Sequence, residues 1–493
     1  MRDNRQSSNA SRDGMTYNEG TSTTAGRPPL TRRPVPPTEP PPLERRHIRG
    51  KQPDLSPKTS ETTLAAAPLR EKRQSRPNPE KTRRENPTTT SAMTRTVAIP
   101  GVMERLRYRT VNPSAVRAGD VIRAKGGVDR AMLVLTILLM CVGTIMVFTA
   151  SYAEALSRHG DSFRFIRPQI GFVAMGMAAM VVLMHIDYRI FKKFSMHVFV
   201  ASMGLLFLVL IFGLAEGQAM RWLRIGPITF QPSEVMKLGI VMFLANYYYK
   251  YTQRVQSIKF WESSSYGVFI PAFVLGVVCV LIMMQNHFSG TIIMMMIGVS
   301  VIWASGARKF WLVAATVAAL VGIVIIIMTV PYARVRITSW LNPENYDLNN
   351  ELWQAHQGRL AIGSGGIFGV GIGNSRQKHM FVPEPQNDFI FTIIAEELGF
   401  VGAMLILGLY LAFIWRGLII ARKAPDAFSS LLVYGIIMKV AIQTTLNIAV
   451  VTGVAPNTGV SLPFASYGGS ALVMLLAEMG IVLSVSRYSF QNK

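Results

Sequence analysis

The sequence predicts an all-α polytopic membrane protein with about ten transmembrane helices, one large extracellular loop and a disordered N-terminal tail. Of its 493 residues, 50% are hydrophobic and only 16% are charged, and the mean hydropathy is +0.29. An ordinary soluble domain carries about 25% charged residues, so a single soluble globular protein is excluded. The apolar residues gather in long runs, while the proline and the positive charge gather near the N-terminus.

Residues 1–128 form the predicted tail, with 25 Lys and Arg, 12 Asp and Glu, and 16 of the 27 prolines. Such a segment cannot bury enough apolar area to offset its chain entropy, so we expect disorder and a tethering or docking role. Its last basic stretch lies beside the first apolar run and is expected to attract anionic headgroups. The net charge of +23 and the pI near 10.3 are typical of nucleic-acid binding. In a membrane protein, however, excess Lys and Arg mark cytoplasmic segments, so we expect no nucleic-acid partner.

The second region, residues 129–487, contains the apolar runs. A membrane-spanning helix needs about 20 apolar residues, and ten runs approach or meet that length. They lie at approximately 131–151, 166–184, 194–214, 233–249, 267–284, 289–305, 311–330, 389–415, 431–451 and 468–486. The first run is long enough to span a bilayer, so it predicts an inserted chain and no cleaved signal peptide.

Lysine and arginine in the connections predict the orientation. The connections on the same side as the tail are basic, whereas 285–288 and 452–467 contain no Lys or Arg. Both termini are therefore expected in the cytoplasm, and the long connection 331–388 outside the cell. A connection of nearly 60 residues is long unless it has a function. Its glycine run, 363–373, lacks the Gly-Lys-Ser/Thr of a phosphate-binding loop and indicates close backbone approach.

Ionisable residues also occur within the runs. Gln231-Pro-Ser-Glu234-Val-Met-Lys237 begins the fourth run, and its Glu and Lys, three residues apart, share one helical face. Charges at membrane depth indicate a functional site, although a structural ion pair is the alternative. Upstream, Arg221-Trp222 is either an interfacial anchor or a ligand for a lipid pyrophosphate. Glu478 is a further acid within a run, and the positions of Glu396 and Glu397 fit a helix terminus.

No cluster of His, Cys and Asp has the spacing of metal ligands, and the two cysteines, Cys141 and Cys279, lie in apolar runs. We read the cysteines as small core hydrophobes. The sequence assigns no cofactor and leaves open whether a divalent cation is used.

Three segments together resemble the SEDS (shape, elongation, division and sporulation) family of bacterial peptidoglycan polymerases. They are Arg221-Trp222 with 231–237, the stretch from Ala361 to Gly399 with Pro385-Gln-Asn-Asp388, and Gly453-Val-Ala-Pro-Asn to Ser-Tyr-Gly-Gly-Ser470. The resemblance covers residues 129–487. Gly373-Asn-Ser-Arg-Gln-Lys378 and the 385–388 segment are similar to the division-type (FtsW) or sporulation branch more than to the elongation type (RodA).

The resemblance implies a glycosyltransferase that polymerises lipid II and releases undecaprenyl pyrophosphate in the bacterial cell membrane, at the division septum. Partners would be a class B penicillin-binding transpeptidase, other division proteins and membrane lipids. The family's proposed catalytic acid follows an Asn-Pro signature, ten residues before a Gln, which fits Asp347 with Gln357. The implied substrate-binding residues are Arg221, Gln231, Glu234, Lys237, Gln354, Gln357, Lys378, Asp388 and Ser470.

The sequence departs from the family at two places. Gln285-Asn-His-Phe-Ser-Gly-Thr291 stands where members commonly have Gln-Pro-Asp-Leu-Gly-Thr, so this loop receives no catalytic role. Leu348 replaces the usual proline after the acid. Two other functions remain as alternatives: a lipid II flippase, because intramembrane charges also line transporter cavities, and a non-catalytic division scaffold, suggested by the tail.

Overall fold

The computed structural model describes residues 126–488, apart from 217–218, 226–227, 330 and 348–351. Residues 1–125 of the predicted tail lie outside the described residues, so its disorder stays a prediction. The chain divides into two units, Met1–Thr89 and Thr90–Lys493, and every described residue belongs to the second unit.

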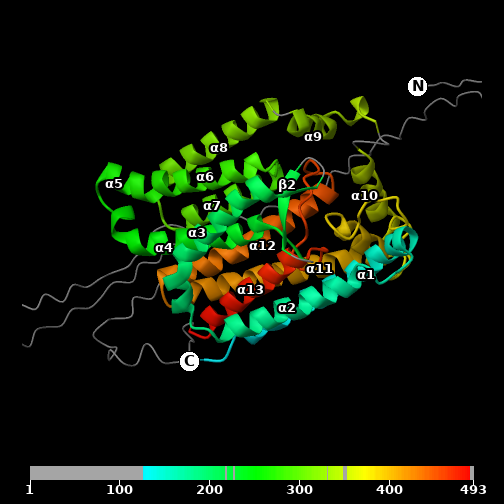
Figure 1. Ribbon diagram of the computed structural model, residues 1–493, viewed down its shortest axis with the longest axis horizontal. Coiled ribbons are helices and arrows are strands. Elements are labelled where there is room, and N and C mark those ends of the chain that lie inside the picture. Colours follow the sequence, from blue (N-terminus) through cyan, green and yellow to red (C-terminus); the bar gives the residue numbers. More distant parts are fainter. Residues whose placement is uncertain (1–125, 217–218, 226–227, 330, 348–351, 489–493) are drawn as a thin grey trace, which may run out of the picture. The chain divides into compact units, whose positions relative to one another are not determined.

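Helices dominate the described unit (Figure 1). The first half contains α1 (Arg130–His159), α2 (Ile166–His185), α3 (Tyr188–Phe212), β1 (Leu214–Glu216), β2 (Ala219–Ile225), β3 (Ile228–Phe230), α4 (Pro232–Val255), α5 (Phe260–Ser264), the π-helix η3 (Ser265–Phe269), α6 (Ile270–Met284) and α7 (Phe288–Ala304). The second half contains α8 (Lys309–Thr329), α9 (Pro331–Leu341), the 3-10 helix η4 (Pro343–Asn345), α10 (Trp353–Ser364), α11 (Ile390–Arg422), α12 (Ala427–Val451) and α13 (Gly469–Ser486).

Each of the ten predicted spans falls on a helix, which confirms the helical class of the membrane region. Among the described residues, seven helices can cross a membrane by length and composition, counting α5, η3 and α6 as one. Two shorter apolar helices are Phe288–Ala304 and Phe310–Gly322. The total of ten spans therefore stays a prediction. The all-α expectation was wrong in one detail: β1, β2 and β3 form a small antiparallel sheet between α3 and α4.

The centre of the bundle is built from α4, α12 and α13. Within the apolar stretch of each helix, 78% of α13 and 67% of α12 is buried, against 22% of α2. The outer α2 packs along α13 (Figure 1), and glycine permits their close approach. A Cβ atom at Gly480 would lie 2.6 Å from the Met180 backbone oxygen.

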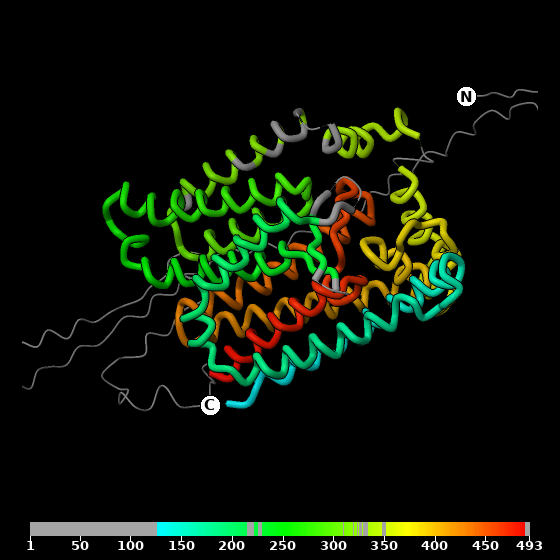
Figure 2. The backbone as a smooth tube through the Cα atoms, viewed as in Figure 1, coloured from blue at the N-terminus to red at the C-terminus, as the bar shows by residue number. Residues whose placement is uncertain are grey.

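Both described chain ends lie at the same end of the bundle (Figure 2). The Gly126 N–H donates to the Arg487 carbonyl at 3.0 Å. Asp129 caps α1 by accepting from the Met132 N–H at 2.9 Å, and its carboxylate also pairs with Arg416 of α11 at 2.7 Å. These contacts join the start of α1 to α11 and α13. We call the other end of the bundle, which carries residues 331–388, the loop end.

The glycine run of the long connection packs against a break in α11. Gly399 has φ 69° and ψ −172°, a backbone conformation that is essentially restricted to glycine. The Phe400 and Val401 N–H groups donate to the carbonyls of Gly366 and Ile367, at 2.9 and 3.1 Å. In return, the carbonyls of Glu396 and Glu397 accept from the N–H groups of residues 370 and 371. The close backbone approach predicted for this run is therefore confirmed.

Candidate functional site

Four buried charges form an alternating row across the three central helices. At the start of α4, where Pro232 suits the first turn, Lys237 Nζ lies 2.5 Å from Glu234 Oε1. The other carboxylate oxygen, Glu234 Oε2, lies 3.9 Å from Lys439 Nζ of α12. Lys439 Nζ donates to both oxygens of Glu478 of α13, at 2.8 and 2.9 Å. All four side chains are almost fully buried, and two acids balance two bases. Glu234 and Lys237 therefore share one helical face, as predicted, and they form the ion pair that the sequence left as the alternative to a functional site.

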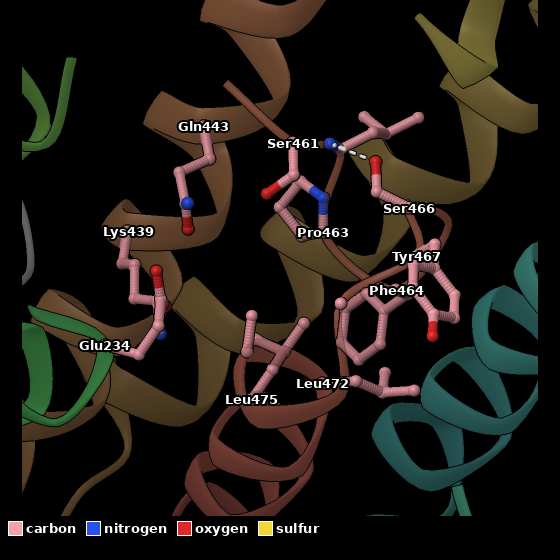
Figure 3. A pocket seen from close by; sticks show the side chains of 13 residues that line it. Glu234, Lys439, Gln443, Ser461, Pro463, Phe464, Ser466, Tyr467, Leu472 and Leu475 are labelled. Atoms are coloured by element: carbon pink, nitrogen blue, oxygen red, sulfur yellow. Dashed lines mark hydrogen bonds and ion pairs between the residues drawn. The ribbon is translucent and has the colours of Figure 1, made fainter. Parts of the chain in front are cut away.

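A cavity borders this row (Figure 3). Glu234, Lys439 and Gln443 form one wall, and the segment 461–468 with α13 forms the other. Its volume of about 30 Å³ accommodates about two water molecules. The lysine that lines the cavity is Lys439, whereas the predicted substrate-binding residue Lys237 contacts Glu234, which itself lines the cavity.

Residues 453–460 link three parts of the loop end through hydrogen bonds. From α9, Arg336 Nη1 donates to the Asn457 carbonyl and Trp340 Nε1 donates to the Gly453 carbonyl, each at 2.8 Å. From α10, Gln354 Oε1 accepts from Asn457 Nδ2 at 3.0 Å, and its amide nitrogen donates to the Pro383 carbonyl at 3.2 Å. Gln354 therefore lies at the junction of α10, the 381–388 segment and residues 453–460.

Asp388 lies just before α11 in this junction. Its backbone carbonyl accepts from Asn447 Nδ2 at 2.7 Å, and the same amide also donates to the Val460 carbonyl. Burial raises the pKa of its carboxyl to about 6, an effect that nearby Glu384 reinforces and that Arg336 and Arg221 oppose. Among the predicted site residues, Asp388 is thus poised to change charge near neutral pH.

Asp347 follows η4 on an exposed part of the connection. Its backbone carbonyl accepts from the Leu352 N–H at 3.5 Å, which joins η4 to the start of α10 across residues 348–351. Gln357, its predicted partner, is buried within α10. The catalytic role of Asp347 stays a prediction.

Lys378 belongs to a second buried ionic group. Its ammonium lies 3.0 Å from Glu397 Oε1 and donates to the Gly373 carbonyl at 2.5 Å, and neither charged side chain is exposed. The neighbouring Glu396 accepts from the Ser375 hydroxyl at 2.5 Å and from the Arg376 N–H at 2.9 Å. Glu396 and Glu397 lie within the first turns of α11, as expected, and their side chains hold residues 373–378 against the helix.

The remaining predicted residues lie on β2, just before α4 and at the start of α13. Arg221 is on β2, and Gln231 precedes α4, where its carbonyl accepts from the Glu234 N–H at 3.1 Å. Ser470 is buried in the first turn of α13. His287 lies in the 285–291 segment that departs from the family sequence, and burial, followed by the charges of Arg221 and Lys237, lowers its pKa to about 3.

Sequence reasoning missed Lys439, although a lysine inside the predicted span 431–451 was a visible signal. It also missed Glu154 of α1, which is buried, accepts from Gln386 Nε2 at 3.2 Å and pairs with Arg158 at 3.0 Å. Within the part of the chain that the structure describes, no three His, Cys, Asp or Glu side chains are grouped to hold a metal ion.

The central helices, the buried charges and the long polar connection define a multi-pass membrane protein with a polar site between its core and its loop end. The chain belongs to the FtsW/RodA/SpoVE family, whose model, described as cell cycle protein, matches residues 129–491.

Curated relatives cover the same region. Stage V sporulation protein E of Bacillus subtilis (strain 168) is 40% identical over 363 residues, which is 73% of this chain and 97% of that protein. The probable peptidoglycan glycosyltransferases FtsW of Geobacter sp. (strain M18) and Geobacter metallireducens are 34% and 36% identical over 73% of this chain, and 97% and 94% of theirs.

Solved structures agree with the fold. A chain of a peptidoglycan synthase complex that coordinates polymerization and crosslinking superposes with a TM-score of 0.60 and 27% identity, over 74% of this chain and 99% of that one. The rod shape determining protein RodA of Thermus thermophilus gives a TM-score of 0.54 and 26% identity, over 74% and 98%.

Proposed function

We propose that this protein is a peptidoglycan glycosyltransferase that polymerises lipid II into glycan strands during cell division and releases undecaprenyl pyrophosphate. The observation that carries the proposal is the match to FtsW proteins named as probable peptidoglycan glycosyltransferases, over 94–97% of their length. The proposal places the loop end outside the cell and both termini in the cytoplasm.

In the proposed reaction, an acceptor sugar hydroxyl attacks the anomeric carbon of the donor. The new C–O bond forms as the bond from that carbon to the diphosphate breaks, and the electron pair leaves with undecaprenyl pyrophosphate. Asp347 takes the hydroxyl proton, a role that contributes about 10²- to 10⁴-fold in rate. Gln354 and Gln357 would bind sugar hydroxyls near it.

The buried row would hold the charged part of the substrate. Cations near a developing pyrophosphate stabilise leaving-group charge, and Lys237 and Arg221 are the proposed cations, with Gln231, Glu234, Asp388 and Ser470 binding polar groups around them. A lipid-linked saccharide would bind against the wall formed by residues 461–468.

A class B transpeptidase is the proposed partner. The structural neighbour from a peptidoglycan synthase complex supports such an assembly, because its chain aligns over 99% of its own length with this one. We propose that the protein acts in cell division and not in sporulation, because of its similarity to FtsW proteins. Pull-down of a transpeptidase from dividing cells tests this proposal.

The deciding experiment is polymerisation of lipid II by the purified full-length protein in detergent, with and without EDTA. Glycan chains appear only if the protein polymerises, whereas a flippase needs sealed vesicles and a scaffold makes no product. Asp347→Asn is expected to fold and lose about 100-fold or more of the rate. Glu344→Gln, an exposed carboxylate in the same connection, is the matched control. Wild-type rates for Asp347→Asn would remove Asp347 from the catalytic role.

A further inference from the structure

Glu234 has two lysine neighbours in the row of buried charges, although one would balance its charge. Glu234 already holds Lys237 at 2.5 Å within α4, yet Lys439 from another helix lies 3.9 Å from the same carboxylate. Lys439 is in turn accompanied by Glu478, which binds its ammonium with both oxygens. Two carboxylates thus share one lysine at the wall of the cavity.

Burying a second pair is energetically demanding. Each buried ion loses several kcal/mol of hydration even after relaxation, and well-packed apolar residues often serve stability as well or better. A pair that only joined α12 to α13 would not need to contact α4 or to line the cavity. Lys439 lies near Glu234 of α4 and also lines the cavity.

The position of Lys439 matters once an anion reaches the row. A phosphate that contacts the Lys237 ammonium competes with Glu234 for its charge, and Glu234 would then be a poorly compensated buried carboxylate. Such a loss of partner is strongly destabilising. Lys439 lies near the other oxygen of that carboxylate, Glu234 Oε2, and can balance the negative charge of Glu234. Glu478 in turn balances the positive charge of Lys439.

We infer that Lys439 is a positioning residue of the substrate site, which holds Glu234 at the cavity wall and releases Lys237 for a diphosphate-bearing lipid. Glu478 is the counter-ion that balances the charge of Lys439 within the row. The inference rests on the proposed function for its ligand, and on the geometry of the row for its mechanism.

The test removes the second pair as a unit. Lys439→Met/Glu478→Leu leaves no uncompensated charge and is expected to fold, with kcat/KM for lipid II lowered about tenfold through both a higher KM and a lower kcat, because Lys237 would bind the diphosphate and stabilise the charge that develops on it as it leaves. Ser430→Ala/Ser484→Ala, which removes one buried hydroxyl from each of the same two helices away from the cavity, is the control with unchanged KM.

Wild-type KM and kcat in the folded Lys439→Met/Glu478→Leu protein would overturn the inference in favour of a structural pair. If that variant does not fold, Lys439→Gln/Glu478→Gln keeps polar contact and replaces it in the assay. If neither variant folds, the pair is a requirement of folding and the inference fails.

A readout independent of activity separates this inference from the proposed function. Glu234→Gln is introduced into the wild type and into the double variant, and the melting temperature of each protein is measured. If Lys439 holds Glu234, the two shifts differ, because interacting residues are not additive. Equal shifts would overturn the inference even if lipid II is not the substrate. Absence of glycan synthesis by the wild type would instead refute the proposed function alone.

Discussion

Replacement of Lys378 by methionine tests the second buried ionic group. The Lys378 and Glu397 side chains are 0% exposed, and Lys378 Nζ contacts both Glu397 and the Gly373 carbonyl. Removing one partner of such a buried pair costs about 3–5 kcal/mol, because it leaves an uncompensated charge. We expect Lys378→Met to lower the free energy of unfolding by that amount.

The double variant Lys378→Met/Glu397→Leu removes both charges. Apolar replacement of a whole buried pair is often neutral or stabilising, so most of the lost stability should return. The free energy of unfolding would be followed in detergent by urea titration of wild type, single and double variants. A single variant within about 1 kcal/mol of wild type would refute the reasoning from burial. A double variant as unstable as the single one would refute the reasoning from the ion pair.

The same proteins decide the function of Lys378. The sequence suggested a substrate-binding role, but the ammonium contacts Glu397 and Gly373 instead of the cavity. We therefore expect the folded double variant to polymerise lipid II at close to the wild-type rate. A stable but inactive double variant would support substrate binding by Lys378.

Three other perturbations test the acid at the loop end, the tail and the break in α11. The pKa of Asp388 is raised to about 6, so the folded protein binds this proton more readily than the unfolded chain does. The stability of the wild type should therefore fall as the pH rises from about 4 to 6, whereas the melting temperature of Asp388→Asn should not show this fall. Deletion of residues 1–100 should leave glycan synthesis in vitro intact while changing recruitment or abundance in cells; loss of synthesis by the folded truncation would contradict the tethering role. Gly399→Ala places a Cβ 2.2 Å from the Gly369 nitrogen and should lower the melting temperature strongly, whereas Gly408→Ala, in open space on the same helix, should not; equal melting temperatures would argue against a required break.

The parts of the fold that could be predicted are those encoded locally. Each apolar run predicts its helix because the pattern and the length lie within one segment. The Glu234–Lys237 pair was predictable for the same reason, since residues three apart on a helix are neighbours. The glycine run 363–373 signalled close backbone approach through its composition alone.

The remaining features depend on contacts between distant segments. Lys439 and Glu478 are 39 residues apart and meet only because α12 packs on α13. Glu396 and Glu397 resembled a helix terminus, but the break at Gly399 brings residues 366–378 against them. No periodicity in either segment encodes that pairing, so the sequence alone could not reveal the second ionic group.

The segment 453–468 connects the cavity to the predicted catalytic acid. Its second half forms the cavity wall, and its first half holds α9 and α10 through the carbonyls of Gly453 and Asn457 and the Asn457 amide. If a bound sugar moves this wall, the displacement would be transmitted along the chain to these hydrogen bonds. Because Asp347 lies between η4 and α10, it would move with them. Movement of the cavity wall and placement of the predicted general base are therefore expected to be coupled.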